Sequence, residues 1–220
     1  MRSALGRKWG DQRLGRKLTK LLRHEAGTVG LAMRDDGFVD MAELRATLAK
    51  GGLDVDDHQI KRIVFMDAKQ RFALQTADDG QSWIRANQGH SLSCVKLESV
   101  ATRLPPPGDS GADESSAPFL HCFHGTTAAA WASIQVSGLS RMNRSAIQMA
   151  IGRPGESHVI SGMRMNSECV IEVDMAGAMR AGIEFFLSTN QVILSKGPIP
   201  PQFLKLVPMG MPAATSSSPH

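Results

Sequence analysis

The sequence predicts an α+β protein with two lobes, an N-terminal winged-helix lobe and a C-terminal lobe built on a mostly antiparallel sheet. Three observations carry this prediction. The first 100 residues show three helical patterns followed by a hairpin, the middle of the chain is rich in Pro, Gly and Ser, and short strands dominate the second half. Of the 220 residues, 42% are hydrophobic, which suffices for a core in each lobe.

Changes of composition divide the chain into five expected segments. We expect a flexible N-terminus over 1–12, the winged-helix lobe over 13–103, a linker over 104–118, the second lobe over 119–207 and a disordered tail over 208–220. The linker, LPPPGDSGADESSAP, has almost no apolar side chains to bury.

The first element is a helix over Leu14–His24 that ends near Ala26. Four leucines recur at the spacing of one helical face, and the basic residues fall on the opposite side. Two explanations of this basic strip stay open: a solvated helix face, or a surface for a phosphate-rich partner with Arg23 and His24 at its end.

The other N-terminal elements follow from caps and alternation. We expect an extended piece at Phe38 and Val39, a helix over 41–50 capped by Asp40, and a second helix over 54–65. Strands over 71–75 and 82–86 flank the turn Asp78–Gly80. This order gives the outline of a winged helix, although many small α+β domains share it.

The second lobe begins with a strand over 119–123 and a helix over 128–137 that stops at Gly138. Further strands are expected over 169–173, 185–187 and 191–194, the last two as a pair. One helix among several short strands indicates an α+β arrangement.

Charge and cysteine content narrow the class of protein. Residues 1–100 carry 17 basic and 13 acidic side chains, whereas the remainder carries eight of each, which favours a polyanion-binding first lobe. Three scattered cysteines predict free thiols and an intracellular protein, cytoplasmic or nuclear. No secretory signal or membrane span is expected, and we expect a monomer.

Several short polar clusters are candidates for chemistry, each with an ordinary structural alternative. Lys69 and Arg71 open a hairpin strand, where edge charges are common. The run IRANQGHS over 84–91 offers polar groups that also suit a turn. His124-Gly125-Thr126 joins a strand to a helix, where a cap is the equal alternative. The arginine loop 141–144 and the turn 161–164 complete the set.

Taken in order, these motifs resemble the RNA 2′-phosphotransferase (tRNA 2′-phosphotransferase) family. The matching pieces are LTKLLRH (18–24), DGFV (36–39), KQRFAL (69–74), IRANQGHS (84–91), HGT (124–126), RMNR (141–144), VISGMR (159–164) and VIL (192–194). Each is short, but together they run through nearly all of Leu14–Val207 in the family's order. The resemblance implies a winged-helix lobe and an ADP-ribosyltransferase-like lobe that takes NAD as co-substrate, with no metal.

The implied reaction removes an internal RNA 2′-phosphate, as at a tRNA splice junction. The phosphate attacks the NAD ribose and expels nicotinamide; a ribose 2″-hydroxyl then attacks the phosphate, releasing 2′-hydroxyl RNA and ADP-ribose 1″,2″-cyclic phosphate. The residues carried over are catalytic Arg23, His24, Arg71 and Arg144, RNA-binding Lys20, Lys69 and Arg71, and NAD-binding His124, Gly125, Thr126, Gln148, Ser161, Gly162 and Arg164.

The chain departs from the family pattern after Arg144. The family has a His-x-His pair there, and this chain has Ala146 and Gln148 instead. Two alternatives to the complete reaction therefore stay open. One is a transferase that stops at ADP-ribosylated RNA, or modifies a protein; the other is a winged-helix RNA-binding module without turnover.

Overall fold

The computed structural model describes residues 4–107, 121–153, 156, 159–163 and 167–208, with side chains from Gly10 onward. The chain divides into two compact units. Unit 1 comprises 1–102, 142–146 and 188–190, and unit 2 comprises 103–141, 147–187 and 191–220. Two short segments from the second half of the sequence thus belong to unit 1. None of the described helices is long and apolar enough to cross a bilayer.

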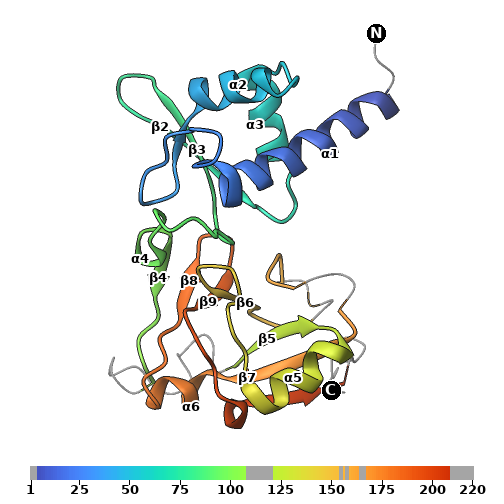
Figure 1. Cartoon of the computed structure of the whole chain (residues 1–220), viewed down its shortest axis with the longest axis vertical. Coiled ribbons are helices and arrows are strands. Elements are labelled where there is room, and N and C mark those ends of the chain that lie inside the picture. The colour runs from blue at the N-terminus through green and yellow to red at the C-terminus, as the bar shows by residue number, and fades with distance from the viewer. Residues whose placement is uncertain (1–3, 108–120, 154–155, 157–158, 164–166, 209–220) are drawn as a thin grey trace, which may run out of the picture. The chain divides into compact units, whose positions relative to one another are not determined.

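The described part of unit 1 contains four α-helices, a π-helical turn and a three-stranded sheet (Figure 1). Its elements are α1 (Ala4–Lys20), a π-helical turn (Leu21–Glu25), β1 (Val39–Asp40), α2 (Met41–Lys50), α3 (Asp57–Phe65), β2 (Phe72–Thr76), β3 (Ser82–Ala86) and α4 (Leu97–Val100). The sheet order is β1-β3-β2, antiparallel throughout.

The leucine stripe predicted for the first helix forms the centre of the unit 1 core. Leu18 and Leu22 are fully buried, together with Leu44 and Leu48 of α2 and Ile60 of α3. The helix begins at Ala4, well before the stripe, so residues expected as a frayed terminus are helical. Apolar spacing reports the buried face of a helix, and Gly10, Gln12 and Arg13 before the stripe are exposed, so this part of the helix gives no such signal.

Caps fix where α2 and α3 begin. The Asp40 carboxylate accepts hydrogen bonds from the backbone N–H groups of Ala42 and Glu43 at 2.8 and 2.9 Å, as predicted. The start expected at residue 54 is wrong: α3 begins at Asp57, because Asp56 and Gln59 form a reciprocal capping box.

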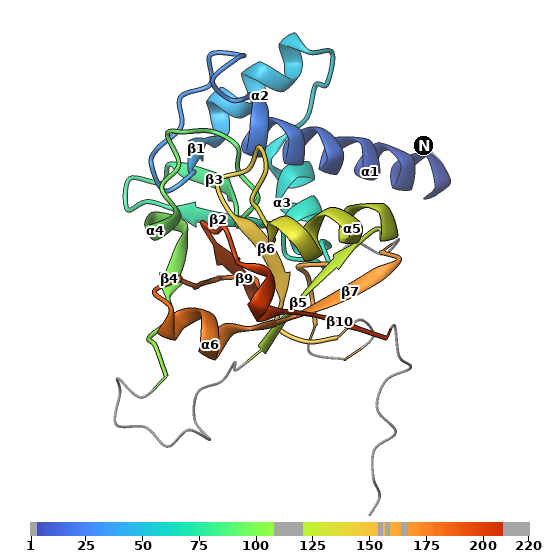
Figure 2. The ribbon, with the colours of Figure 1, turned by 60° about the horizontal axis from the view of Figure 1, so that its bottom comes forward.

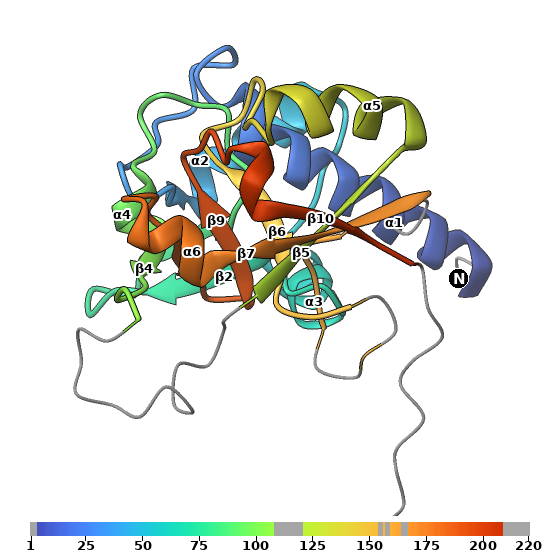
Figure 3. The ribbon, with the colours of Figure 1, turned by 90° about the horizontal axis from the view of Figure 1, so that it is seen from below.

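Unit 2 contains most of a seven-stranded sheet of order β10-β7-β5-β6-β9-β8-β4 (Figure 2). The strands are β4 (Ala101–Arg103), β5 (His121–Thr126), β6 (Ile147–Ala150), β7 (Cys169–Asp174), β8 (Phe186–Ser188), β9 (Val192–Ser195) and β10 (Leu204–Val207). The helices α5 (Ala128–Ser137) and α6 (Met175–Arg180) lie beside this sheet and apart from each other (Figure 3). The mostly antiparallel α+β prediction is confirmed.

Some unit 2 elements differ from their expected bounds. The strand expected over 119–123 begins, within the described residues, at His121 and continues to Thr126. The pair expected over 185–187 and 191–194 is β8 with β9, where Phe186 lies opposite Leu194. Strands β6 and β10 are not predicted from the sequence, because each has only four residues and so short an alternation does not stand out from a loop.

We predict that Asp40→Ala lowers the free energy of unfolding by about 1–2 kcal/mol, since two backbone donors of α2 lose their acceptor. Asp40→Asn keeps a capping oxygen and should stay within about 0.5 kcal/mol of the unmodified protein. Urea unfolding followed by circular dichroism measures both. An Asp40→Ala variant as stable as the parent would show that this cap does not hold the helix.

Candidate functional site

Arg23 and His24 lie in the π-helical turn that follows α1. The N–H of Ala26 donates to the carbonyl of Leu21 at 3.0 Å, five residues back, which defines the wider turn. Leu21 and Leu22 are buried and anchor the turn. Single π turns recur at functional sites because they shift the direction of the side chains that follow.

Arg71 is held by a tight turn that begins at Asp67. The Asp67 carboxylate accepts from the Arg71 backbone N–H at 2.6 Å and forms an ion pair with the Arg71 guanidinium. Gln70, which lies between them in the sequence, has a φ of 45°. This backbone conformation is energetically unfavourable for a residue with a Cβ. Inside the turn, the Lys69 carbonyl accepts from buried Asn190 at 3.1 Å.

The segment Asn87–Ser91 connects the pieces of chain that carry the candidate catalytic residues. The Asn87 N–H donates to the carbonyl of Arg71 at 2.8 Å, and its side-chain amide donates to the carbonyl of Gln70 at 2.7 Å. The Ser91 N–H donates to the carbonyl of Arg23 at 2.9 Å.

The third connection of this segment leads to the arginine loop. The carbonyl of His90 accepts from both the N–H and the hydroxyl of Ser145, each at 2.9 Å. Ser145 directly follows Arg144. One segment therefore holds Arg71, Arg23 and Arg144 through backbone groups beside them.

The three arginines face the same region of unit 1. Burial, and then the positive charges of Arg71 and Arg144, lower the pKa of Arg23 to about 10. Like charges brought together raise the free energy of an empty site, and a bound anion removes that cost. Among the described residues, nothing accepts a hydrogen bond from Nε or Nη2 of Arg23. The arrangement suits a phosphate.

His24 joins this cluster as a neutral side chain. Partial burial, followed by the charges of Arg23 and Arg144, lowers the pKa of His24. Glu25 opposes this shift. A histidine with a lowered pKa is uncharged at neutral pH and can accept a proton.

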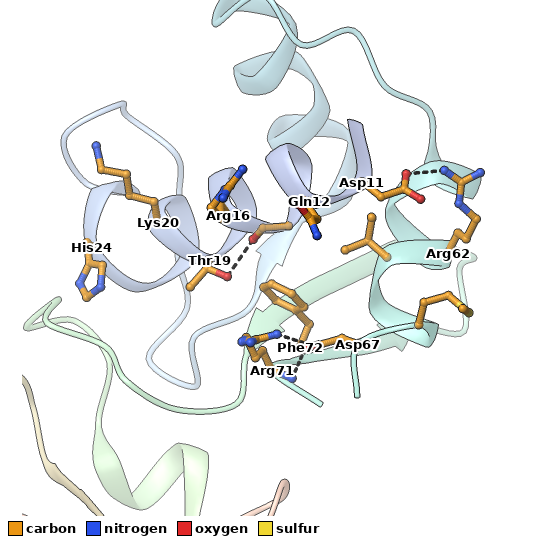
Figure 4. Close-up of a pocket in the computed structure, with 13 residues that line it drawn as sticks. Asp11, Gln12, Arg16, Thr19, Lys20, His24, Arg62, Asp67, Arg71 and Phe72 are labelled. Atoms are coloured by element: carbon orange, nitrogen blue, oxygen red, sulfur yellow. Dashed lines mark hydrogen bonds and ion pairs between the residues drawn. The ribbon is translucent and has the colours of Figure 1, made fainter. Parts of the chain in front are cut away.

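A groove of about 1,000 Å³ runs from this cluster along α1. Figure 4 shows its lining side chains: one side comes from α1, and the other from α3 and the start of β2. Its cations are Arg16, Lys20, His24 when protonated, Arg62 and Arg71. Asp11 bonds to Arg62 at 2.5 Å and Asp67 to Arg71, so both carboxylates are already neutralised by neighbours.

The two predicted RNA-binding lysines, Lys20 and Lys69, lie in different elements of unit 1. Lys20 lines the groove and pairs with Glu25 at 2.5 Å. Lys69 is half-buried in the turn before Arg71. An exposed ion pair contributes little free energy, so its lysine remains available to another anion.

In unit 2, His124, Gly125 and Thr126 belong to β5 rather than to a turn after it. They lie opposite Ile171, Val170 and Cys169 of β7. The residue that caps α5 is Thr127, whose hydroxyl accepts from Ala130 at 3.2 Å.

Next to β5, strand β6 separates after a single pair. Phe123 lies opposite Ala150, and the ladder does not continue through 124–126, all of which the structure describes. His124 Nδ1 donates to the carbonyl of Gln148 at 2.9 Å across this opening. In a neutral ring, this bond leaves Nε2 as the acceptor.

The turn at Ser161 and Gly162 packs against the same two strands. A Cβ at Gly162, whose φ is +102°, would come within 2.8 Å of the Ala150 Cα, and one at Gly125 within 2.4 Å of the Met163 side chain. The structure therefore gathers His124, Gly125, Gln148, Ser161 and Gly162. Arg164, the remaining candidate, lies outside the described residues.

Sequence reasoning missed the residues that hold this site. Asp67, Ser145 and Asn190 bond mainly to backbone carbonyls and amides, and the first of these also to a guanidinium. Such contacts produce no spacing in the sequence. The sequence indicates the segment Asn87–Ser91 as a candidate. Its polar residues also suit an ordinary turn, so the hydrogen bonds that it makes to distant backbone groups are not predicted.

Comparison with known proteins decides the family. The sequence model of the "RNA 2'-phosphotransferase, Tpt1 / KptA family" matches residues 10–197. The chain belongs to this family. A zebrafish (Danio rerio) tRNA 2'-phosphotransferase 1 is 41% identical over 188 residues, covering 85% of this chain and 79% of that protein. The human tRNA 2'-phosphotransferase 1 is 40% identical, covering 85% and 70%.

Bacterial members align as well. A probable RNA 2'-phosphotransferase of Streptomyces griseus is 32% identical over 198 residues, covering 88% of this chain and 95% of that protein. The family resemblance expected from eight short motifs is thereby confirmed.

We predict a pH-dependent loss of stability from His90. Burial, then the charges of Arg23 and Arg85, lower the pKa of His90 to about 4, below the ordinary 6.5. The unfolded chain thus binds this proton more readily between pH 6.5 and 4, and unfolding becomes easier as pH falls through that window. The loss is about 3 kcal/mol.

Urea unfolding at pH 7, 5 and 4 measures this loss, with His90→Gln as the control that lacks the titrating ring. The pH dependence of the variant should be smaller by roughly the same 3 kcal/mol. Equal pH dependence in the two proteins would rule out His90 as its source.

Proposed function

We propose that this protein removes an internal 2′-phosphate from RNA, as at a tRNA splice junction, and consumes NAD. The observation that carries the proposal is the convergence of Arg23, Arg71 and Arg144 on one region beside a neutral His24. The family assignment supports the same chemistry, since relatives over most of the chain are named as tRNA or RNA 2'-phosphotransferases.

Unit 1 supplies the RNA side of the proposal. Its order of helix, strand, two helices and two strands, with the first strand paired to the last, agrees with a winged helix. The groove along α1 would take the RNA strand next to the 2′-phosphate, with Arg16 and Lys20 near its backbone phosphates. Lys69 would contact a phosphate near Arg71.

Unit 2 supplies the NAD side, as an ADP-ribosyltransferase-like lobe. The β5–β6 ladder has one pair, Phe123 with Ala150, and we propose that the dinucleotide binds where the two strands diverge beside residues 124–126. His124, held by the Gln148 carbonyl, would accept a hydrogen bond from a ribose hydroxyl. Thr126, Ser161, Gly162 and Arg164 would complete the pocket.

In the first step the RNA phosphate attacks the anomeric carbon of the NAD ribose. Nicotinamide leaves as a neutral molecule from a cation, so the site needs no strong acid at this position. Arg23 and Arg71 would hold the phosphate and orient its attacking oxygen.

In the second step the ribose 2″-hydroxyl attacks the same phosphorus and the bond to the RNA 2′-oxygen breaks. The proton of the 2″-hydroxyl is accepted by His24, and the RNA 2′-oxygen takes a proton from water as it leaves. Negative charge spreads over the phosphate oxygens, where Arg144 would stabilise it.

The departure at Ala146 and Gln148 affects the NAD side. Ala146 is buried, and Gln148 presents its carbonyl to His124. The backbone of this strand thus keeps one contact that requires no imidazole, and we propose that it supports NAD use in place of the family's histidine pair.

We predict that Arg144→Ala lowers turnover of a 2′-phosphorylated RNA by about 10³-fold, because one cation at a reacting phosphate has this effect. Arg141→Ala, in the same loop but exposed, should stay within about twofold. The assay mixes protein, RNA and NAD and measures nicotinamide, ADP-ribose cyclic phosphate and 2′-hydroxyl RNA.

Each result of the assay distinguishes one function. Full turnover that depends on Arg144 supports the proposed reaction. ADP-ribosylated RNA that persists as the end product would indicate a transferase that stops after one step. RNA binding without nicotinamide release would indicate a binding module and overturn the proposal.

A further inference from the structure

The contact between Ser91 and His24 is not explained by the family resemblance. The Ser91 hydroxyl lies 2.9 Å from Nδ1 of His24 and 3.5 Å from the backbone carbonyl of Arg23. A serine hydroxyl has one proton, so it donates to only one of these two groups. The direction of that donation decides which nitrogen of the imidazole carries its proton.

Only one placement of the protons makes both contacts of the Ser91 hydroxyl hydrogen bonds. If Ser91 donates to the Arg23 carbonyl, which can only accept, its oxygen is available to accept from Nδ1–H of His24. If Ser91 donates to Nδ1 instead, no hydrogen atom lies between its hydroxyl oxygen and that carbonyl, so this contact is not a hydrogen bond. In the first arrangement a relay runs from His24 through Ser91 to the Arg23 carbonyl, and the ring proton lies on Nδ1.

We infer that Ser91 is a positioning residue that keeps His24 as the Nδ1–H tautomer, with Nε2 as the proton acceptor of the second step. This inference rests on the proposed function, because the acceptor takes the proton of the 2″-hydroxyl as that oxygen bonds to phosphorus. The electron pair of the broken bond goes to the RNA 2′-oxygen, which then takes a proton from water.

The surroundings of His24 favour a neutral ring, in which the choice of tautomer matters. The charged groups that act on it are Arg23, Arg144, Lys20 and the opposing Glu25. His90 also senses the charge of His24 and is itself deeply buried. Partial burial, together with three cations against one carboxylate, lowers the pKa of His24 and leaves the imidazole uncharged at neutral pH.

The backbone gives Ser91 a fixed position from which to act. Its N–H donates to the Arg23 carbonyl at 2.9 Å, and the neighbouring His90 carbonyl is held by Ser145 at 2.9 Å. The serine therefore moves little relative to the π-helical turn that carries His24. A partner that orients an imidazole is most effective when its own position is fixed.

The first test is a tautomer measurement that needs no catalysis. In protein labelled with ¹⁵N-histidine, NMR shifts of the two ring nitrogens of His24 report which one is protonated, and His24→Gln assigns the signals. We expect Nδ1–H in the unmodified protein and a mixture in Ser91→Ala. An Nε2–H tautomer in the parent, or no change in Ser91→Ala, would overturn the inference.

The second test separates the two chemical steps in single-turnover experiments. Ser91→Ala should release nicotinamide within about twofold of the parent rate, but convert the ADP-ribosylated RNA roughly 10-fold or more slowly, since general-base catalysis contributes about 10²–10⁴-fold. Ser91→Thr, which retains the hydroxyl, should restore the second step. Ser93→Ala, nearby and exposed, is the matched control.

The outcomes keep the two proposals apart. If the parent protein does not turn over RNA, the proposed function fails, and the tautomer measurement still decides the role of Ser91. If the parent turns over and Ser91→Ala slows both steps equally, Ser91 has a structural role only, and the inference is wrong.

Discussion

The mutual repulsion of three arginines is the constraint on which the rest of unit 1 depends. Arg23, Arg71 and Arg144 come from separate parts of the sequence, and the charges of two of them lower the pKa of the third. Such a cluster would move apart if its side chains were the only contact. The structure instead fixes the backbone beside each arginine with hydrogen bonds to Asn87–Ser91. Rigid main chain thus holds the cations in place for an anion.

Much of the fold followed from the sequence because local signals agreed with tertiary packing. The leucine stripe of α1, the Asp40 cap and the hairpin strand over 82–86 each have a spacing or residue type with a direct physical meaning. Signals failed where a strand was too short for its alternation to stand out, as in β6, or where a cap set a later helix start, as at Asp56.

The candidate site was predictable in its side chains but not in its supports. Arg23, His24, Arg71 and Arg144 stand out as cations in short polar motifs. Their convergence depends on Asn87, Ser145 and Asn190, which bond to backbone carbonyls far away in the sequence. Contacts of this kind have no period and no preferred neighbour, so a single sequence carries no trace of them.

The division of the chain into units has a consequence for fragments of this protein. Ser145 and Asn190 belong to unit 1 although the sequence between and around them folds into unit 2. A gene fragment ending near residue 102 would encode all the described helices of unit 1 and still lack Ser145 and Asn190. Such a fragment would lose the hydrogen bonds that Ser145 makes to the His90 carbonyl and Asn190 makes to the Lys69 carbonyl.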